Sequence, residues 1–331
     1  MGFQTQDVER KVISILHVLN DVKEPLGARV IAQHLKDYGV ELGERAVRYH
    51  LKLMDERGLT QLVGRRDGRV LTEQGVEEVR NALVRDKVGF ANTKIELLAY
   101  RTGFDIEKRC GQIPVNASFF PKEKFNRALH AMKSTFEAGL CVSDRVAVAQ
   151  EGELLGELIV PEGKVGLATV CSIVINGTLL KAGVPVDSRF AGILQIRNHK
   201  PLRFVELIRY DGCSLDPSAI FIRARMTSVR EVVRKGDGKI LANFREIPAP
   251  CRPTAEAILA RLSEAGLHGL LLMGDTSEPL CEVPVEPNKI GMILIVGLNP
   301  IAAAEEVGIE AENLTMSTAM EYQNLVRIQE L

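Results

Sequence analysis

The sequence lacks the patterns that mark secreted, membrane-spanning and zinc-binding proteins. Its six cysteines include no C-x-x-C pair, and its six histidines form no H-x-x-x-H or H-E-x-x-H motif, so zinc-ligand spacing is absent. The longest apolar run, Ile290 to Ala304, contains Asn299-Pro300 and is too short to cross a bilayer. No signal-peptide pattern precedes the first expected helix. We therefore expect reduced thiols, no metal, no membrane contact and a cytoplasmic location.

Catalytic motifs are missing too. The sequence contains no P-loop, no G-x-G-x-x-G, no G-x-S-x-G and no H-x-x-E-H. This absence favours a binding protein over an enzyme, with no catalytic residues and no cofactor. The net charge of −1 indicates no strongly charged partner for the chain as a whole. At 331 residues, the chain is long enough for two or three globular domains.

Residues 44–54 have the periodicity of a helix with one apolar face and one basic face. Val47, Leu51 and Met54 recur at i, i+4 and i+7, which is the stripe of a helix packed on a core. The opposite face carries donors of the kind that bind phosphates and base edges in DNA. These donors are Arg45, Arg48, Tyr49 and Lys52.

The flanking segments predict a winged helix-turn-helix. Helices are expected at Arg10–Leu19 and Ala28–Leu35, and β-prone runs at Thr60–Val63 and Arg69–Leu71 surround the turn signal Asp67-Gly68. Residues 45–69 hold seven basic side chains against three acidic ones, whereas residues 1–86 as a whole are neutral. Such a local patch fits phosphate contact. The hairpin tip would bring further cations to the duplex, namely Arg65, Arg66 and Arg69. A winged helix that binds protein instead of DNA is the alternative.

A charged amphipathic helix, expected to run to about Lys87, closes this first domain. We predict a DNA-binding domain over residues 1–88 and a second domain over residues 89–331. The fold class is an N-terminal all-α winged helix-turn-helix followed by an α/β or α+β domain.

The second domain contains an internal repeat, with halves at about residues 91–200 and 201–331. The segment Ile95–Tyr100 matches Val205–Tyr210, and Gln112-Ile113-Pro114 matches Glu246-Ile247-Pro248. Helices expected at 122–137 and 254–264 both end in Ala-Gly-Leu. One offset of 125 residues then relates four further pairs: Glu157 and Glu282, Lys164 and Lys289, Gly166 and Gly291, and Gly183 and Gly308. We interpret this order as a duplicated unit that forms one pseudo-symmetric domain.

The duplication also indicates a candidate ligand site. At this offset Thr169, Cys171 and Ser172 stand where the second half has apolar residues or glycine, and buried polar groups need partners. They either line a site or bond locally within the protein. Arg189 and Arg245 are candidate cations for a carboxylate. Each has an acidic neighbour, Asp187 or Glu246, so structural salt bridges are the alternative.

Several stretches resemble the nitrogen regulatory repressor (NrpR) family, and the resemblance covers essentially the whole chain. They are Val47–Met54, Leu83–Phe90, Gly166–Ile173, Leu179–Val186 and Asn243–Pro248. The resemblance implies a homodimeric transcriptional repressor of nitrogen-assimilation genes that binds double-stranded DNA and senses 2-oxoglutarate, a small dicarboxylate. Three alternatives stay open: a regulator that senses another anionic metabolite, an enzyme fused to an autoregulatory winged helix, and an oligomerisation platform without ligand.

Overall fold

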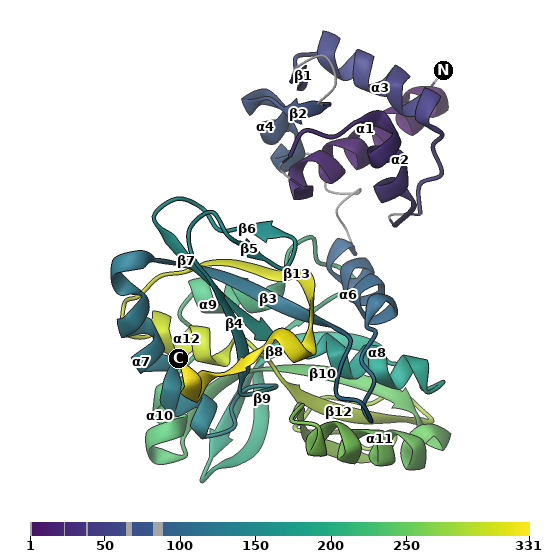
Figure 1. Cartoon of the computed structure of the whole chain (residues 1–331). Coiled ribbons are helices and arrows are strands. Elements are labelled where there is room, and N and C mark those ends of the chain that lie inside the picture. The colour runs from purple at the N-terminus through teal and green to yellow at the C-terminus, as the bar shows by residue number, and fades with distance from the viewer. Residues whose placement is uncertain (1, 23, 38, 64–67, 82–88) are drawn as a thin grey trace. The chain divides into compact units, whose positions relative to one another are not determined.

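The chain divides into two compact units, Met1–Lys87 and Val88–Leu331. The structure is a computed structural model, and it describes residues 2–22, 24–37, 39–63, 68–81 and 89–331. No helix of those ranges combines the length and the apolar character that crossing a bilayer requires. Figure 1 shows the elements of both units, which are described separately here.

The first unit is a helical domain with a small hairpin. Leu16, Ile31, Leu51 and Met54 have no exposed surface and join its first three helices in one core. The hairpin strands pair in antiparallel fashion from Thr60↔Leu71 to Leu62↔Arg69. The elements are, in order, α1 (Gly2–Val22), α2 (Ala28–Asp37), α3 (Glu44–Glu56), β1 (Thr60–Leu62), β2 (Arg69–Leu71) and α4 (Glu73–Asn81).

This element order confirms the winged helix-turn-helix prediction. The two expected leading helices are present and extend beyond their predicted ends. α4 confirms the start of the expected charged helix, whereas its remainder towards Lys87 lies outside the described residues. The hairpin tip at residues 64–67, with Arg65 and Arg66, also lies outside them.

The second unit contains two five-stranded sheets, whose paired strands are all antiparallel. The first sheet has the order β13-β3-β7-β4-β14 and the second the order β11-β12-β10-β8-β9. In chain order the strands are β3 (Gln112–Pro121), β4 (Arg145–Ala149), β7 (Lys164–Val170), β8 (Asp187–Arg197), β9 (Lys200–Arg209), β10 (Gly238–Pro248), β11 (Leu270–Thr276), β12 (Lys289–Ile295), β13 (Glu312–Glu321) and β14 (Val326–Arg327). A separate two-stranded hairpin is formed by β5 (Leu154–Leu155) and β6 (Leu158–Ile159).

Each half of the chain completes the sheet of the other half. β8 follows the first half's helix yet pairs with β10, and β13 follows the second half's helix yet pairs with β3. Figure 1 shows the yellow C-terminal strand β13 lying along the blue strand β3. The duplicated unit is therefore one interlocked domain, since neither sheet forms without strands from both halves. The predicted junction near residue 200 falls at the start of β9, after the β8–β9 turn.

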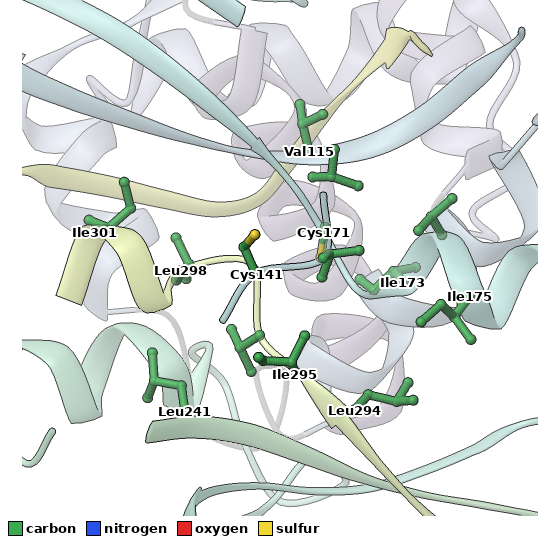
Figure 2. Close-up of a cluster of buried hydrophobic side chains, with 14 of the residues drawn as sticks. Val115, Cys141, Cys171, Ile173, Ile175, Leu241, Leu294, Ile295, Leu298 and Ile301 are labelled. Carbon is green, nitrogen blue, oxygen red and sulfur yellow. The ribbon is translucent and has the colours of Figure 1, made fainter. Parts of the chain in front are cut away.

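The helices of this unit pack on and between the two sheets. Residues of both halves meet in one apolar cluster, where Val115 and Cys171 of the first half lie near Leu241, Leu294 and Ile295 of the second (Figure 2). The helices are α6 (Phe90–Arg101), α7 (Phe125–Glu137), α8 (Ile173–Lys181), α9 (Pro217–Arg223), α10 (Val229–Lys235), α11 (Arg252–Glu264) and α12 (Asn299–Glu305), with short 3-10 turns at Lys122–Lys124, Ala249–Cys251, Tyr322–Asn324 and Ile328–Glu330.

The duplication at an offset of 125 residues is confirmed over equivalent elements. β7 and β12 begin at Lys164 and Lys289. Gly183 and Gly308, which follow α8 and α12, share a φ of +80°, a backbone conformation that favours glycine. The helices α7 and α11 likewise both end before a glycine of positive φ, Gly139 or Gly266.

Two of the proposed repeat matches were wrong. Ile95–Tyr100 lies in helix α6, whereas Val205–Arg209 lies in strand β9. Gln112-Ile113-Pro114 begins β3, whereas Glu246-Ile247-Pro248 ends β10 and so corresponds to the end of β3 at Pro121. Short strings match by chance, because helices and strands draw on the same residue types.

Candidate DNA-reading surface and effector site

Helix α3 presents the predicted basic face to solvent. Val47, Leu51 and Met54 are completely buried. Gly43 precedes the helix in an extended conformation, as an N-cap residue does. Arg45, Arg48, Tyr49 and Lys52 are all exposed, Tyr49 to 61%. Their exposure agrees with the predicted face, and their contact with DNA stays a prediction.

The ion pairs on this face leave its cations accessible. Arg48 bonds to Glu44 and Lys52 lies 3.9 Å from Glu56, yet the two cationic side chains remain 70% and 77% exposed. Ion pairs with such exposed side chains contribute little to stability. The cations can therefore leave their glutamates and pair with another anion. The face therefore remains available to phosphate oxygens or base edges.

Arg69 differs from the other predicted DNA-binding residues. Its Nε donates to Asp55 Oδ2 over 2.7 Å, and its side chain is 24% exposed. Asp55 also accepts a 2.6 Å bond from the Thr60 hydroxyl. These bonds join both hairpin strands to the end of α3. Arg69 thus fixes the wing against the helix, and part of its hydrogen-bonding capacity is already used.

The predicted effector residues do not all meet in one place. Side chains alternate along a strand, so Arg245 and Glu246 of β10 point to opposite faces of their sheet. Arg189 lies on the Glu246 side, 3.8 Å from Glu246 Oε2. Arg189 is also the extra residue of a β-bulge, because Phe244 pairs with Phe190 and Arg245 with Ser188. The two arginines belong to different surroundings.

Arg189 is part of a network of three carboxylates and two cations. It bonds to Glu286 and lies 3.4 Å from Asp187, while Lys289 Nζ lies 2.7 Å from Glu286 and 2.9 Å from Asp187. The Glu246 side chain is fully buried at its centre. The carboxylates lie close enough to hold a metal ion, but the two cations already neutralise most of their charge. This geometry fits the structural salt bridge that the sequence left open for Arg189.

Arg245 is buried without the charge partner that its neighbour has. Its side chain is among the largest fully buried ones, and the residue is 1% exposed. Among the described residues its Nε and Nη1 have no hydrogen-bond partner and no carboxylate forms an ion pair with it. Its guanidinium lies over the Tyr210 ring, 5.2 Å from the centroid. The buried carboxyl group of Asp216 acts electrostatically on Cys171 and Tyr210, but it forms no ion pair with Arg245 among the described residues. A buried charge without an ion-pair partner is costly, so this position favours an anion.

Polar side chains from both halves surround this guanidinium. The Tyr210 hydroxyl donates to Asn243 Oδ1 over 2.8 Å, and Asn243 Nδ2 donates to Ser172 Oγ over 3.0 Å. Cys171 lies beside Ser172 in sequence, at the end of β7. We name Arg245, Tyr210, Asn243, Ser172 and Cys171 the Arg245 cluster. It contains three predicted effector residues, and sequence reasoning missed Tyr210 and Asn243.

The uncharged members of the Arg245 cluster stay neutral at physiological pH. Burial raises the pKa of the Cys171 thiol to about 11 and also raises the pKa of Tyr210. Asn243 lies two residues before Arg245 on β10, so both side chains point to the same face of the sheet. This spacing is the sequence pattern from which Asn243 could have been predicted. The guanidinium is therefore the only charged group among these five residues. The carboxyl group of Asp216, whose pKa is raised by burial, acts on Cys171 and Tyr210 from outside the cluster.

Thr169 and Asn176 lie on the elements that carry Cys171 and Ser172. Thr169 is 2% exposed, and its hydroxyl has no hydrogen-bond partner in the described part of the chain. Asn176 of α8 donates to Ser188 Oγ over 3.1 Å, and its carbonyl oxygen likewise lacks a partner there. Two surface hollows of about 290 and 580 Å³ lie elsewhere, around residues 193–198, 225–228 and 237–239.

Comparison with known protein families matches both units. Residues 88–327 match the model described as NrpR regulatory domains NRD1 and 2. Residues 13–79 match the ribonuclease R winged-helix domain.

The similar proteins found include global nitrogen regulators of three organisms. The chain is 44% identical to the global nitrogen regulator NrpRI of Methanosarcina mazei, over 97% of this chain and 98% of that protein. It is 34% identical to the global nitrogen regulator NrpR of Methanocaldococcus jannaschii and 31% identical to that of Methanococcus maripaludis, but it spans only 56% and 52% of their lengths. A solved nitrogen repressor-like protein from Methanococcus jannaschii aligns with a TM-score of 0.61 at 25% identity, over 72% of this chain and 98% of that one.

Proposed function

This chain belongs to the NrpR family, and on that basis we propose that it is a dimeric, DNA-binding repressor of nitrogen-assimilation genes. We further propose that 2-oxoglutarate releases it from its operator. The Methanosarcina mazei relative, which is called a global nitrogen regulator, matches the chain over nearly its whole length. The winged helix and the Arg245 cluster supply one candidate surface for each half of this function.

The DNA-reading half rests on the face of α3. A recognition helix enters the major groove, and a dimer presents two such helices to half-sites one helical turn apart or a multiple of that. Arg45, Arg48, Tyr49 and Lys52 would contact base edges and phosphates. Arg65 and Arg66 of the hairpin tip remain candidates for phosphate or minor-groove contact, whereas Arg69 would act mainly by holding the wing.

The sensing half rests on one observation, the buried guanidinium of Arg245, whose Nε and Nη1 have no hydrogen-bond partner among the described residues. A planar guanidinium suits a carboxylate, and a bond to a charged group is stronger than a neutral one. Ser172 and Thr169 would donate to the remaining ligand oxygens, and Cys171 would line the apolar side. A small dicarboxylate with a keto oxygen, such as 2-oxoglutarate, offers acceptors for all of these donors. Arg189 stays a weaker candidate, because three carboxylates surround it.

The effector would act by linkage. Binding to the second unit would favour a dimer in which the two recognition helices no longer match the half-sites. A coupling of about 1–3 kcal/mol would change DNA affinity about 5- to 150-fold. A sensor is preferred to a platform without ligand, because a platform does not explain a buried guanidinium whose Nε and Nη1 lack hydrogen-bond partners among the described residues. An enzyme stays a second possibility that any observed turnover would support.

Calorimetry with the full chain tests the sensing half. We expect heat of binding with 2-oxoglutarate and none with Arg245→Met, while the matched variant Lys181→Met, at an exposed position of α8, binds normally. A panel of other small carboxylates identifies the ligand if 2-oxoglutarate gives no heat. If none of them binds, the protein is not a sensor of this class.

Arg48→Ala tests the DNA-reading half. If Arg48 contacts a base edge, its loss should weaken operator binding by about 1–3 kcal/mol while fold and dimer persist, since the side chain is 70% exposed. Fluorescence anisotropy on an operator selected in vitro with the wild-type chain measures this. Replacing Arg65 and Arg66 should instead lower affinity for every sequence and reduce the salt slope by roughly 0.9 per lost phosphate contact. Unchanged affinity and slope would remove these residues from the DNA surface.

A further inference from the structure

Helix α8 begins directly at the Arg245 cluster. Ser172, which accepts from Asn243, is its N-cap residue. One turn later Asn176 donates to Ser188, and Ser188 is the strand partner of Arg245. All residues of α8 from Ile173 to Leu179 are buried. A change at the cluster therefore acts on a helix that is held on every side by packed neighbours.

Helix α6 packs against α8 at a point without space. A Cβ placed on Gly177 of α8 would overlap the Cβ of Thr102 and lie 2.6 Å from the Ala99 carbonyl oxygen. Thr102 is the C-cap of α6 and is 1% exposed, and its hydroxyl donates to Leu98 O over 2.9 Å. The two helix backbones touch at this glycine, so a displacement of α8 is transmitted directly to α6.

The other end of α6 contacts the segment that carries Tyr210. The Ala91 amide donates to the Cys213 carbonyl oxygen over 3.2 Å, and the Cys213 amide donates to the Tyr210 carbonyl oxygen over 3.1 Å. Both ends of α6 are thus tied to members of the Arg245 cluster, one through α8 and one through residues 210–213. α6 is also the first described helix after the segment that joins the two units.

From these contacts we infer that α6 is the element that senses occupancy of the Arg245 cluster, with Gly177 as its contact, and passes it to the winged helix. The inference rests on the proposed function, whose effector site it uses. An anion that pairs with Arg245 would also form hydrogen bonds with Ser172 and Tyr210. These residues belong to the two segments that contact the ends of α6. Occupancy would then change the position of α6, the first described helix of the second unit.

Amide hydrogen exchange of the full chain tests this directly, with 2-oxoglutarate as one perturbation and Arg245→Met without ligand as the other. We expect exchange in α6 to change about 5- to 150-fold, the usual range of coupling between sites, while α7 changes little. A response to both perturbations supports the proposal. A response to Arg245→Met alone supports the relay and rejects 2-oxoglutarate as effector. If neither perturbation alters exchange in α6, the relay is overturned, whatever the ligand is.

Gly177→Ala gives the second test. The added methyl should displace α6, so that the variant still binds 2-oxoglutarate by calorimetry but its operator affinity no longer falls on ligand addition. Gly103→Ala is the matched control, because its Cβ would meet neighbours only at 3.7 Å or more. A wild-type response in Gly177→Ala contradicts the proposal. The Arg245→Met comparison does not need this variant, so the test stands even where Gly177→Ala fails to fold.

Discussion

Ser118 in β3 and Arg245 in β10 occupy equivalent positions in the two halves, opposite Asn313 of β13 and Ser188 of β8. Both side chains are buried, to 0% and 1% exposure. Ser118 donates to Asn313 Oδ1 over 2.7 Å, whereas Arg245 has no hydrogen bond for its Nε or Nη1 among the described residues. The duplicated backbone thus buries a satisfied polar pair in one sheet and an unsatisfied charge in the other.

The helices after β7 and β12 show a second contrast of this kind. Asn299 of α12 is completely buried, and its amide makes three bonds to the backbone of Leu241 and Val296. Asn176 of α8 is also buried, yet its carbonyl oxygen has no partner in the described part of the chain. In α12 the polar side chain is fully hydrogen-bonded to the protein's own backbone. The other helix leaves the carbonyl oxygen of Asn176 without a partner in the described part of the chain, close to the Arg245 cluster through Ser188.

The largest effect should come from the charged network around Glu246 in the sheet of β10. Phe119 stands in β3 where β10 has Glu246, so apolar packing serves at the equivalent place. Glu246→Gln should lower the free energy of unfolding by about 3 kcal/mol, which is the lower end of the range for breaking a buried ion pair. The loss stays at that end because the cations that pair with Glu246 still pair with Asp187 and Glu286.

Urea unfolding of the full chain, following the transition of the second unit, measures this loss. Asp187→Asn is the matched control at a side chain that is 43% exposed, and it should cost about 1 kcal/mol or less. Equal losses for the two variants would mean that burial does not distinguish Glu246 from its neighbours.

The comparison of Ser118 with Arg245 predicts effects of opposite sign. Ser118→Ala removes a satisfied buried bond and should destabilise by about 1 kcal/mol. Arg245→Met removes a buried charge that has no ion-pair partner among the described residues. It should stabilise the ligand-free protein by about 1–2 kcal/mol and abolish binding of the proposed effector. Thermal unfolding without ligand compares the two variants. Destabilisation by Arg245→Met would show that the guanidinium is needed for packing and would weaken its assignment to a ligand.

The sequence predicted what depends on local periodicity. The two faces of α3 follow from spacing within a single helix, and the hairpin follows from a short turn signal between two β-prone runs. The offset of 125 residues was evident from residues that recur in the same order in both halves. The exchange of β8 and β13 between the sheets was not predictable, because strand pairing joins residues far apart in the chain. The chance matches of Ile95–Tyr100 and Gln112–Pro114 show the same limit.

The candidate site was predictable in part. The small polar residues after β7 stood out against their apolar copies, and Arg245 was named from its residue type. Its adjacency to Glu246 indicated a salt bridge, but strand alternation separates the two side chains. Glu246 instead meets Arg189 and Lys289, which come from other strands. Which charge stays unpaired is decided by tertiary contacts, and these lie beyond the reach of a sequence pattern.

The smallest expected effect concerns Cys171, whose equivalent in the second half is Val296. The thiol is 6% exposed, and burial raises its pKa to about 11. A raised thiol pKa means that the reactive thiolate is scarce below that pH, so Cys171 should resist iodoacetamide at pH 8. Alkylation should instead reach the half-buried thiols first, which are Cys110, Cys213, Cys251 and Cys281.

Mass spectrometry of tryptic peptides distinguishes these sites, with Cys141 as the internal control because its pKa is raised to about 12 by the same cause and it is also buried. Cys171→Val, which copies the second half, should change the free energy of unfolding by less than about 1.5 kcal/mol, as volume-conserving exchanges do. If Cys171 reacts as fast as the half-buried thiols while Cys141 stays protected, the end of β7 opens in the native protein. A ligand could then enter the cluster by local opening. The end of β7 would be packed like the region around Val296 only for part of the time.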